Sequence, residues 1–594
     1  MRAKVTRARI WADSGSPARS FPLGQLGANV ARVRSCCERL VPYSVTAALV
    51  LSCVGRQGSE PSPAPPITAT ASASPEPGPA IVPQAKLVVV IVIDQMRADY
   101  YDRLGPQWQR GFKQLREQGR YFSAAYHEHA LTETAPGHAS ISTGTDPARH
   151  GIVANGWFDR AAGAKVNAVA DPRVSILGLD SATGSSPANL LRESVGDWAQ
   201  AADPAAIVIA MAVKDRAAIL LGGQRPDAAL WYEDELGGFT SSSYYTNQAP
   251  AWVEAYNASD RAAQLFGEHG WTLSLAETEY GDSRMTTDPK LVTTFYNYAL
   301  TKQFPHVIET PGKLARNVVR DTPFADQMVL ELAREAIAAE RMGADEVPDL
   351  LLIGLSGGDY AGHRYGPNSV EIHDYYLRID AALGAFVDHL DSTIGADNYL
   401  LVLTSDHGVA PMPEYSDIPT AGRFIAKDQV PPLLARAAKR VGLSRKQTPR
   451  IDLAHGLELT FPAAVPEPTR AALRAALAEL LREHALVADA WTRDELIGED
   501  QRNEFADPWR RSFHPERSGD VLIQLAPGVA THPAGTGHGT PYQYDQHVPL
   551  LIRGPGWSGV DDQRVSTIDL APTIAGILGV EVGAGVDGRV IERR

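Results

Sequence analysis

The amino-acid sequence predicts an α/β fold: a doubly wound, mostly parallel sheet flanked by helices, with inserted cap segments. Short runs of Val, Ile and Leu end in polar loops, and helical patterns lie between these runs. Near-continuous apolar runs are typical of strands buried on both faces, as in a parallel sheet. Because strands alternate with helices, we expect a doubly wound sheet that binds ligands beyond the carboxyl ends of its strands.

Four of the apolar runs lead into chemically active side chains. The runs are "KLVVVIVID" with Asp94, "AAIVIAMAVKDR" with Lys214 and Arg216, "PDLLLIGLSGGDYAGH" with Asp359 and His363, and "NYLLVLTSDHG" with Asp406 and His407. The carboxyl ends of parallel strands share one edge of a sheet. These side chains are therefore expected to lie close together.

Helical patterns separate the strands. From Ile372 onward, apolar residues recur at steps of four and three, which places them on one helix face. The segments 326–340 and 468–483 are also expected to be helical. Within a catalytic domain over residues 85–594, the ranges of about 222–325 and 410–530 are expected to be insertions into the sheet.

Aromatic pairs in the first insertion allow two interpretations. Trp231-Tyr232 and Tyr244-Tyr245 could form the core of a cap, or they could stack on a nucleoside. The first interpretation is favoured, because large aromatic side chains usually fill a core.

Composition limits the function classes. The chain has 594 residues with 44% hydrophobic and 21% charged residues, as in ordinary globular proteins. A formal net charge of −14 argues against a nucleic-acid partner. An anionic substrate is still compatible with it, because a few local cations can outweigh the mean field.

The first 53 residues predict an export leader. Arg32, Arg34 and Arg39 precede the apolar run "VPYSVTAALVLSC", which is too short to span a bilayer as a helix. Its end, "VLSC", resembles a bacterial lipoprotein processing site with Cys53 as the lipidated residue; a plain secretory signal is the alternative. We expect an exported, periplasmic protein with a possible membrane tether through Cys53.

The rest of the N-terminal region agrees with export. All three cysteines precede residue 54, so the body has no thiol available for a disulfide. Residues 54–84 are rich in Pro, Ala and Ser, and such a segment buries too little apolar surface to fold. It is expected to be a disordered tether.

The acidic and imidazole side chains predict a metal centre. Asp359 and His363 lie one helical turn apart, Asp406 and His407 are adjacent, and His538 lies in a glycine-rich loop. An isolated Asp-His pair is usually part of a capped turn. Together with Asp94, however, these residues provide the mixed oxygen and nitrogen ligands typical of divalent metal. The other histidines singled out, all expected to be structural, are His127, His129, His373 and His547.

The stretch "LTETAPGHASISTGTDPARHGIVANGW" contains candidate nucleophiles. Thr132 and Thr134 both precede the Ala-Pro-Gly-His run, and Asn155 follows. A threonine hydroxyl needs a base or a metal to act as a nucleophile. These residues alone do not choose between the two threonines.

Several motifs carry a family resemblance. "VIDQMRADY", "TETAPGHASISTG", "GIVANGW", "KDRAAIL", "DYAGHRYGP", "TSDHG" and "GHGTPYQYDQHVP" run in the family's order over about residues 88–580. They resemble the alkaline phosphatase superfamily, and more closely the phosphate-irrepressible alkaline phosphatases of the PafA type. These enzymes are related to nucleotide pyrophosphatases/phosphodiesterases.

The resemblance implies a two-zinc site. One zinc would be held by Asp359, His363 and His538, and the other by Asp94, Asp406, His407 and Thr134. It also implies that Thr134 is the nucleophile and forms a phosphothreonine intermediate. Thr132 would then bond to the backbone of its loop, and His138 would orient that loop.

The resemblance also implies how the phosphoryl group is bound. Asn155, Lys214 and Arg216 would contact its oxygens and favour small phosphate monoesters, as in an alkaline phosphatase. In the alternative interpretation, Lys214 and Arg216 form surface ion pairs and have no role in binding substrate. The alternative function is a phosphodiesterase or nucleotide pyrophosphatase that uses the same threonine and metals.

Overall fold

The computed structural model describes residues 84–593, apart from residues 181–182, 294–298, 311–312, 455–456 and 499–500. The predicted leader, including Cys53, lies outside the described residues, as does the predicted tether except Gln84. Among the described residues, no helix is both long enough and apolar enough to cross a membrane.

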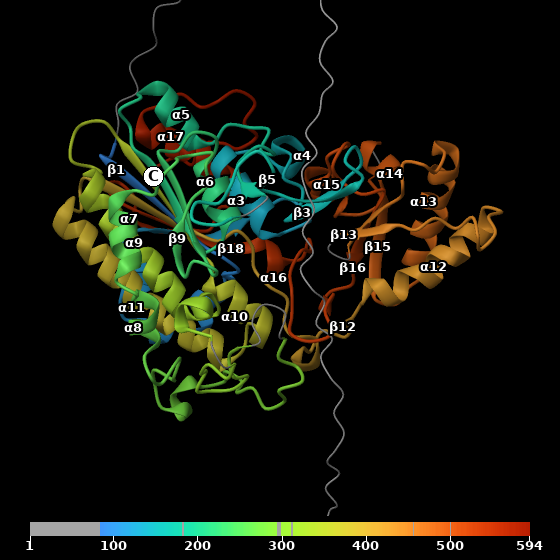
Figure 1. The fold of residues 1–594 in the computed structure, drawn as a ribbon, viewed down its shortest axis with the longest axis horizontal. Coiled ribbons are helices and arrows are strands. Elements are labelled where there is room, and N and C mark those ends of the chain that lie inside the picture. Colours follow the sequence, from blue (N-terminus) through green and yellow to red (C-terminus); the bar gives the residue numbers. More distant parts are fainter. Residues whose placement is uncertain are drawn as a thin grey trace, which may run out of the picture. The chain divides into compact units, whose positions relative to one another are not determined.

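Ten strands of the described residues form the central sheet (Figure 1). Their order is β19-β2-β18-β11-β1-β10-β7-β8-β9, with β20 beside β2. The strands span β1 Leu87–Ile93, β2 Arg120–Tyr126, β7 Val208–Ala212, β8 Ala228–Glu233, β9 Gly238–Thr240, β10 Asp349–Leu355, β11 Tyr399–Thr404, β18 His547–Arg553, β19 Gly559–Asp561 and β20 Val565–Ser566. The central pairs are parallel, whereas β18 and β9 pair antiparallel with their neighbours. The predicted mostly parallel sheet is confirmed.

Helices cover both faces of this sheet. Leu87, Val89 and Ile91 of β1 belong to one core, together with residues of α2, α9 and α11. Val88 and Val90 belong to a second core, built with α5 and α17. Alternate residues of one strand therefore pack on opposite faces, as in a doubly wound fold. These helices span α2 Gly111–Gln118, α5 Val195–Ala202, α9 Pro323–Glu340, α11 Val370–Thr393 and α17 Leu570–Leu578.

The strand order explains why the polar clusters converge. Strands β11, β1, β10 and β7 are direct neighbours and run parallel. Their carboxyl ends therefore lie along one edge of the sheet. The loops and first helical turns that follow these strands carry most of the predicted site residues.

The first predicted insertion contains part of the central sheet. Residues 228–240 form β8 and β9, so the sheet extends further along the chain than expected. Trp231 and Tyr232 are buried in β8, in agreement with a packing role rather than nucleoside stacking. Tyr244 is exposed and contacts Tyr245 edge-on.

The second predicted insertion builds its own core. Its four-stranded antiparallel sheet has the order β13-β14-β16-β15 and packs with α12 and α13 to one side of the central sheet (Figure 1). The elements span α12 Ala426–Arg440, β13 Asp452–Ala454, β14 Glu458–Thr460, α13 Glu467–Arg482, β15 Val487–Thr492 and β16 Val521–Leu525. This core also includes Ala130, Leu131 and Ala154, so it reaches the segments around both candidate threonines and Asn155.

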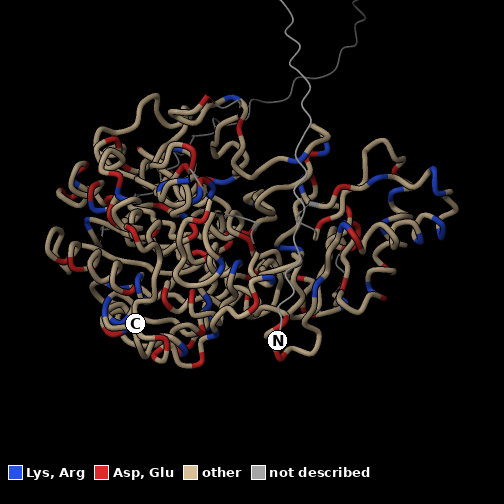
Figure 2. Tube along the Cα trace, turned by 60° about the horizontal axis from the view of Figure 1, so that its bottom comes forward, with Lys and Arg blue, Asp and Glu red and all other residues tan. Residues whose placement is uncertain are grey.

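The other α-helices and strands of the described residues complete the fold. They are α1 Tyr100–Arg103, α3 Thr134–Thr143, α4 Pro147–His150, β3 Gly156–Asp159, β4 Ala164–Asn167, β5 Ala170–Asp171, β6 Gly184–Ser185, α6 Asp215–Gly222, α7 Ala251–Ala258, α8 Arg261–Phe266, α10 Gly357–Tyr365, β12 Gly422–Arg423, α14 Arg493–Ile497, α15 Ala506–Ser512, β17 Val529–Ala530 and α16 Gln543–Gln546. Along the described part of the chain, acidic and basic residues are intermingled rather than gathered in one segment (Figure 2).

Candidate active site

Thr134 is the first residue of α3 and is 1% exposed. The start of a helix carries partial positive charge and unpaired N–H groups, which favour an anion there. One turn further on, Gly137 packs against the backbone of Asp406: an added Cβ would lie 2.3 Å from the Asp406 carbonyl oxygen. A glycine in "APGH" therefore lets α3 approach the loop after β11.

Lys214 lies at the centre of the acidic cluster. Its Nζ donates to Asp94 Oδ2 and to Asp359 Oδ2, each at 2.6 Å, and lies 3.2 Å from Thr134 Oγ1. The side chain is buried. It is therefore not in a surface ion pair. It connects the segments that follow β1, β7 and β10 to the start of α3.

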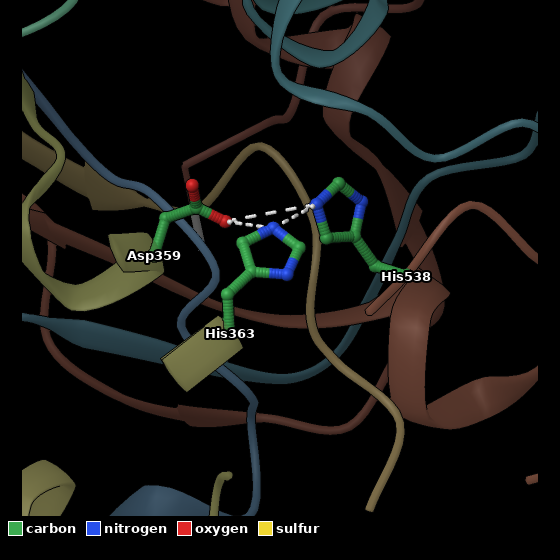
Figure 3. A group of neighbouring side chains, drawn as sticks. All are labelled: Asp359, His363 and His538. Atoms are coloured by element: carbon green, nitrogen blue, oxygen red, sulfur yellow. Dashed lines mark hydrogen bonds and ion pairs between the residues drawn. The ribbon is translucent and has the colours of Figure 1, made fainter. Parts of the chain in front are cut away.

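The first group of possible metal ligands comes from α10 and the glycine-rich loop (Figure 3). His363 Nε2 lies 3.1 Å from Asp359 Oδ1, and His538 Nε2 lies 3.6 Å from the same oxygen. The two imidazole Nε2 atoms are 3.2 Å apart. The predicted set Asp359, His363 and His538 is thus brought together.

The second group contains Asp94, Asp359 and His407. His407 Nε2 lies 3.5 Å from Asp94 Oδ1 and 3.6 Å from Asp406 Oδ2. Asp406 therefore lies next to this second group. Asp359 belongs to both groups. All the predicted ligands lie around one centre.

Hydrogen bonds orient the imidazoles toward that centre. The Nδ1 atoms of His363, His538 and His407 donate to the backbone carbonyls of Thr536, Thr132 and Gly408 at 2.8, 2.7 and 2.9 Å. An imidazole that donates from Nδ1 keeps a lone pair on Nε2, and metal-binding histidines are held in this way. The Nε2 atoms are those that approach the carboxylates.

Unsatisfied polar atoms indicate that the cluster fits metal ions. Within the described residues, Asp94 Oδ1, Asp406 Oδ2 and His407 Nε2 are buried without a hydrogen-bond partner. Buried polar groups are otherwise almost always bonded. Carboxylate and imidazole donors suit a divalent transition metal. The residues therefore fit a metal centre.

The electrostatics of the cluster follow from burial and charge crowding. Burial, and then the neighbouring Asp406 carboxylate, raises the pKa of Asp94 well above its ordinary value. Burial also lowers the pKa of His407 well below 6.5, which keeps its imidazole neutral. Burial would lower the pKa of Lys214, but the carboxylates of Asp359 and Asp94 outweigh it and raise this pKa.

A pocket of about 560 Å³ opens beside the cluster. Asn155 and Arg216 line it together with His363 and His538, so all four predicted residues share one cavity. Among the described residues, Arg216 Nε is buried without a hydrogen-bond partner. The second insertion adds an apolar wall to the pocket through Ile425, Ala426, Leu453 and Leu457.

Two residues of the "TETAPGH" motif have supporting contacts. Thr132 Oγ1 donates to the carbonyl of Thr540 at 3.1 Å, so its hydroxyl bonds to a distant loop rather than to its own. His138 Nδ1 donates to the carbonyl of Thr134 at 2.8 Å and lies 3.1 Å from Asp406 Oδ2. Both residues therefore hold segments that carry cluster residues.

The four histidines that the sequence predicted to be structural lie outside the cluster. His127 bonds Ser405 O and Thr567 Oγ1, His373 bonds Ser283 Oγ, and His547 bonds Ser123 O. His129 is buried, with its ring 5.2 Å from that of His127. None of the four belongs to the two ligand groups found in the described part of the chain.

Sequence reasoning missed Gln95. It has a φ of 67°, its backbone N–H donates to Asp406 Oδ1 at 3.1 Å, and its Nε2 donates to Asp359 Oδ1 at 2.6 Å. A non-glycine residue in the left-handed region is strained, and such strain often accompanies a functional site. Its position directly after Asp94 was the available signal.

Sequence reasoning also missed Glu133, the residue before Thr134. Its Oε2 accepts the backbone N–H of Asn155 at 2.7 Å, and the side chain lines the pocket. The available signal was that Glu133, directly before the candidate nucleophile, is the one acidic residue in "LTETAPGHASISTG".

A model of the type I phosphodiesterase/nucleotide pyrophosphatase family matches residues 88–543. Alkaline phosphatase PhoV of Synechococcus elongatus is 34% identical over 519 residues, which cover 86% of this chain and 93% of PhoV. Alkaline phosphatase PafA of Elizabethkingia meningoseptica is 32% identical over 524 residues, which cover 86% of this chain and 94% of PafA.

The crystal structure of wild-type PafA is similar to this fold with a TM-score of 0.78 at 31% identity; it covers 86% of this chain and 99% of its own. A second crystal structure is that of a PafA variant with one threonine, one asparagine, one lysine and one arginine replaced. The sequence intervals from that threonine to the asparagine, and from the lysine to the arginine, equal those from Thr134 to Asn155 and from Lys214 to Arg216.

Proposed function

The chain belongs to the type I phosphodiesterase/nucleotide pyrophosphatase family, and we propose that it is a metal-dependent alkaline phosphatase that hydrolyses small phosphate monoesters. One observation carries the proposal: Thr134 Oγ1 lies at a helix start, within a cluster of carboxylates and imidazoles, 3.2 Å from the Lys214 ammonium. The relatives named alkaline phosphatases support the same activity.

We propose two zinc ions as the cofactor. Asp359, His363 and His538 would hold one; Asp94, Asp406, His407 and the Thr134 hydroxyl would hold the other. The neutral His407 and the Nε2 orientation of the imidazoles support this assignment. Zinc bound there supplies Lewis-acid charge, which polarises phosphoryl oxygens and makes a hydroxyl more acidic.

Thr134 is the proposed nucleophile. Its Oγ1 attacks the phosphorus and the bond from phosphorus to the leaving-group oxygen breaks. The threonine hydroxyl gives up its proton and the leaving-group oxygen gains one, so an alcohol leaves and a phosphothreonine forms. Water then attacks the phosphorus, the bond from phosphorus to Oγ1 breaks, and a proton of the water restores the threonine hydroxyl as inorganic phosphate leaves. The engaged hydroxyl of Thr132 supports the choice of Thr134. Covalent catalysis of this kind divides one difficult displacement into two easier ones.

Asn155, Lys214 and Arg216 are proposed to hold the phosphoryl oxygens. Arg216 and Asn155 line the same pocket, and Lys214 is 3.2 Å from the nucleophilic oxygen. Phosphoryl transfer depends mainly on positioning and on charge stabilisation. A monoester presents two negative charges and a diester one, so two cations favour the monoester. The apolar wall from the second insertion would contact the leaving group.

The test compares two matched aryl substrates, a phosphate monoester and its methyl diester, with the zinc-loaded protein. We expect a higher kcat/KM for the monoester, and a fall of about 100-fold in Arg216→Ala with a much smaller change for the diester. Arg225→Ala, which removes an exposed arginine, is the control.

Two outcomes would contradict the proposal. One is a preference for the diester that Arg216→Ala leaves unchanged. This result would assign the chain a phosphodiesterase activity, which the name of the matching family also includes. Failure of either ester to react with metal present would remove the enzyme assignment itself.

We propose export and lipidation from the sequence alone. The apolar run that ends at Cys53 and the Pro/Ala/Ser-rich segment after it support this proposal. Metabolic labelling with a radioactive fatty acid should label the wild-type protein and not Cys53→Ala. Labelling of neither protein, with both found free in the periplasm, would favour the plain secretory signal.

A further inference from the structure

Glu133 occupies the N-cap position of α3 but does not cap that helix. An N-cap side chain normally accepts an N–H from the first turn of its own helix. Glu133 makes no such bond. Its Oε2 instead accepts the backbone N–H of Asn155 at 2.7 Å, from a loop that begins after α4.

Asn155 supplies the missing cap in return. The N–H of Ala135, the second residue of α3, donates to Asn155 Oδ1 at 2.9 Å. This N–H is among the first four of the helix, which have no partner within the helix. The two residues have therefore exchanged roles: Asn155 caps the helix of the nucleophile, and Glu133 holds the backbone of Asn155.

These two hydrogen bonds also determine which atoms of Asn155 remain for a ligand. Its Oδ1 accepts from Ala135, and its backbone carbonyl accepts from Ala168 at 3.0 Å. The side-chain NH₂, which can only donate, is left for the pocket that Asn155 and Glu133 both line. A group that only donates suits a phosphoryl oxygen.

We propose that Glu133 is a positioning residue, which holds Asn155 so that its amide NH₂ meets the phosphoryl group on Thr134. This inference rests on the proposed function, because that proposal assigns Asn155 to the phosphoryl oxygens. The negative charge of Glu133, which lines the pocket, would repel an anionic substrate. Glu133 would therefore help catalysis through its hydrogen bond to Asn155 and not through its charge.

Three substitutions separate the hydrogen bond from the charge and from helix stability. Glu133→Ala removes the acceptor and should lower the monoester kcat/KM about tenfold or more. Glu133→Gln keeps an acceptor without the charge, so its kcat/KM should stay within about twofold of wild type or rise. Glu133→Asp provides a favoured N-cap side chain, too short to reach Asn155, so the melting temperature should be kept while kcat/KM falls.

Amide hydrogen exchange gives a readout that does not depend on activity. The N–H of Asn155, followed by mass spectrometry of peptides over residues 150–158, should exchange faster in Glu133→Ala and Glu133→Asp but not in Glu133→Gln. Glu193→Ala, which removes a surface carboxylate paired with Arg225, is the control and should match wild type in every measurement.

A double-mutant cycle completes the test. In the background of Asn155→Ala, adding Glu133→Ala should cause little further loss, because Glu133 acts through Asn155. Additive losses, or unchanged exchange at Asn155 in Glu133→Ala, would overturn the proposal. If Asn155→Ala itself retains wild-type activity, the assignment of Asn155 in the proposed function fails, and the exchange measurement still decides whether Glu133 holds this loop.

Discussion

At the residue scale, Lys214 balances much of the charge in the carboxylate cluster. It contacts Asp94 and Asp359 and approaches Thr134, all within a buried site. A buried cation between two carboxylates is tolerated because each charge is paired and hydrogen-bonded. The same cation next to the proposed nucleophile, Thr134 Oγ1, would also attract a phosphate dianion, so one residue links the packing of the site to its choice of substrate.

Glu458 in the second insertion gives a pH-dependent prediction. Burial, and then the nearby Glu133 carboxylate, raises the pKa of Glu458 to about 8. An unfolded glutamate ionises near pH 4.3. Between about pH 4.3 and pH 8, Glu458 is therefore ionised in the unfolded chain but still protonated in the folded protein. The stability that Glu458 contributes is therefore complete below pH 4.3 and is lost as the pH rises to about 8.

Glu458→Gln should remove this loss. Relative to wild type, its free energy of unfolding should rise between pH 5 and pH 9, by on the order of 3 kcal/mol. Urea unfolding at several pH values measures the difference, with the exposed Glu479→Gln as control. Parallel pH profiles for Glu458→Gln and wild type would mean that Glu458 is ionised in the folded protein at neutral pH.

At the scale of elements, Asp326 of α9 fixes the start of α10. Its carboxylate accepts the N–H groups of Ser356 and Gly357 at 2.7 and 2.8 Å and the hydroxyl of Tyr375 at 2.6 Å. Helix α10 carries Asp359 and His363. A buried carboxylate on one helix therefore orients two proposed metal ligands on another.

Asp326→Ala should destabilise the fold and weaken metal binding together. Loss of three hydrogen bonds to a buried carboxylate should cost about 3 kcal/mol or more. Asp326→Asn keeps one amide oxygen as acceptor and should lie between alanine and wild type. Denaturant unfolding and zinc competition with a chromogenic chelator measure the two effects. A loss of stability with unchanged zinc affinity would show that α10 holds its ligands without this clamp.

The contact between α3 and the loop after β11 gives a second prediction at this scale. In Gly137→Ala the new Cβ would lie 2.3 Å from Asp406 O and 2.8 Å from Asp406 Cβ, so the loop or the helix must move. We expect kcat/KM to fall at least 10-fold, because positional errors near 1 Å are costly in catalysis.

A second helical glycine provides the matched control. An added Cβ at Gly576 of α17 meets no atom within 4 Å. Gly576→Ala should therefore keep full activity and gain about 0.5–1 kcal/mol of stability. If Gly137→Ala were as active as Gly576→Ala, the close approach would have no role in placing Asp406 against Thr134.

At the scale of the whole molecule, the proposed metal centre joins segments that are distant in sequence. Asp94, Thr134, Asp359, Asp406 and His538 follow or begin different elements, yet they surround one point. Bound ions would therefore stabilise the folded chain over the unfolded one, by about 4 kcal/mol when free metal is 1,000 times its Kd.

Chelation should reverse this stabilisation. Dialysis against a strong chelator should abolish phosphatase activity and lower the melting temperature, and added zinc should restore both. In Asp359→Asn, whose carboxylate adjoins both groups of ligands, the chelator should change the melting temperature much less. A melting temperature that is insensitive to chelator while the ions are demonstrably removed would mean that the loops are held together without them.

The sequence by itself determined the framework and the kinds of side chain at the proposed site. Apolar runs at strand length and a helical period identified β1, β7, β10, β11, α9, α11 and α13. Side chains in the segments after those strands supplied most of the proposed ligands, because the carboxyl edge of a parallel sheet is set by the direction of its strands. Such signals are local, so a single sequence contains them.

Only the tertiary structure decided how residues from distant segments meet. It placed β8 and β9 in the central sheet, set Lys214 between Asp94 and Asp359, and paired Glu133 with Asn155. Neither periodicity nor spacing specifies these contacts. They depend on which loops the packed sheet and the second insertion bring together, and on the requirement that each buried polar group finds a partner.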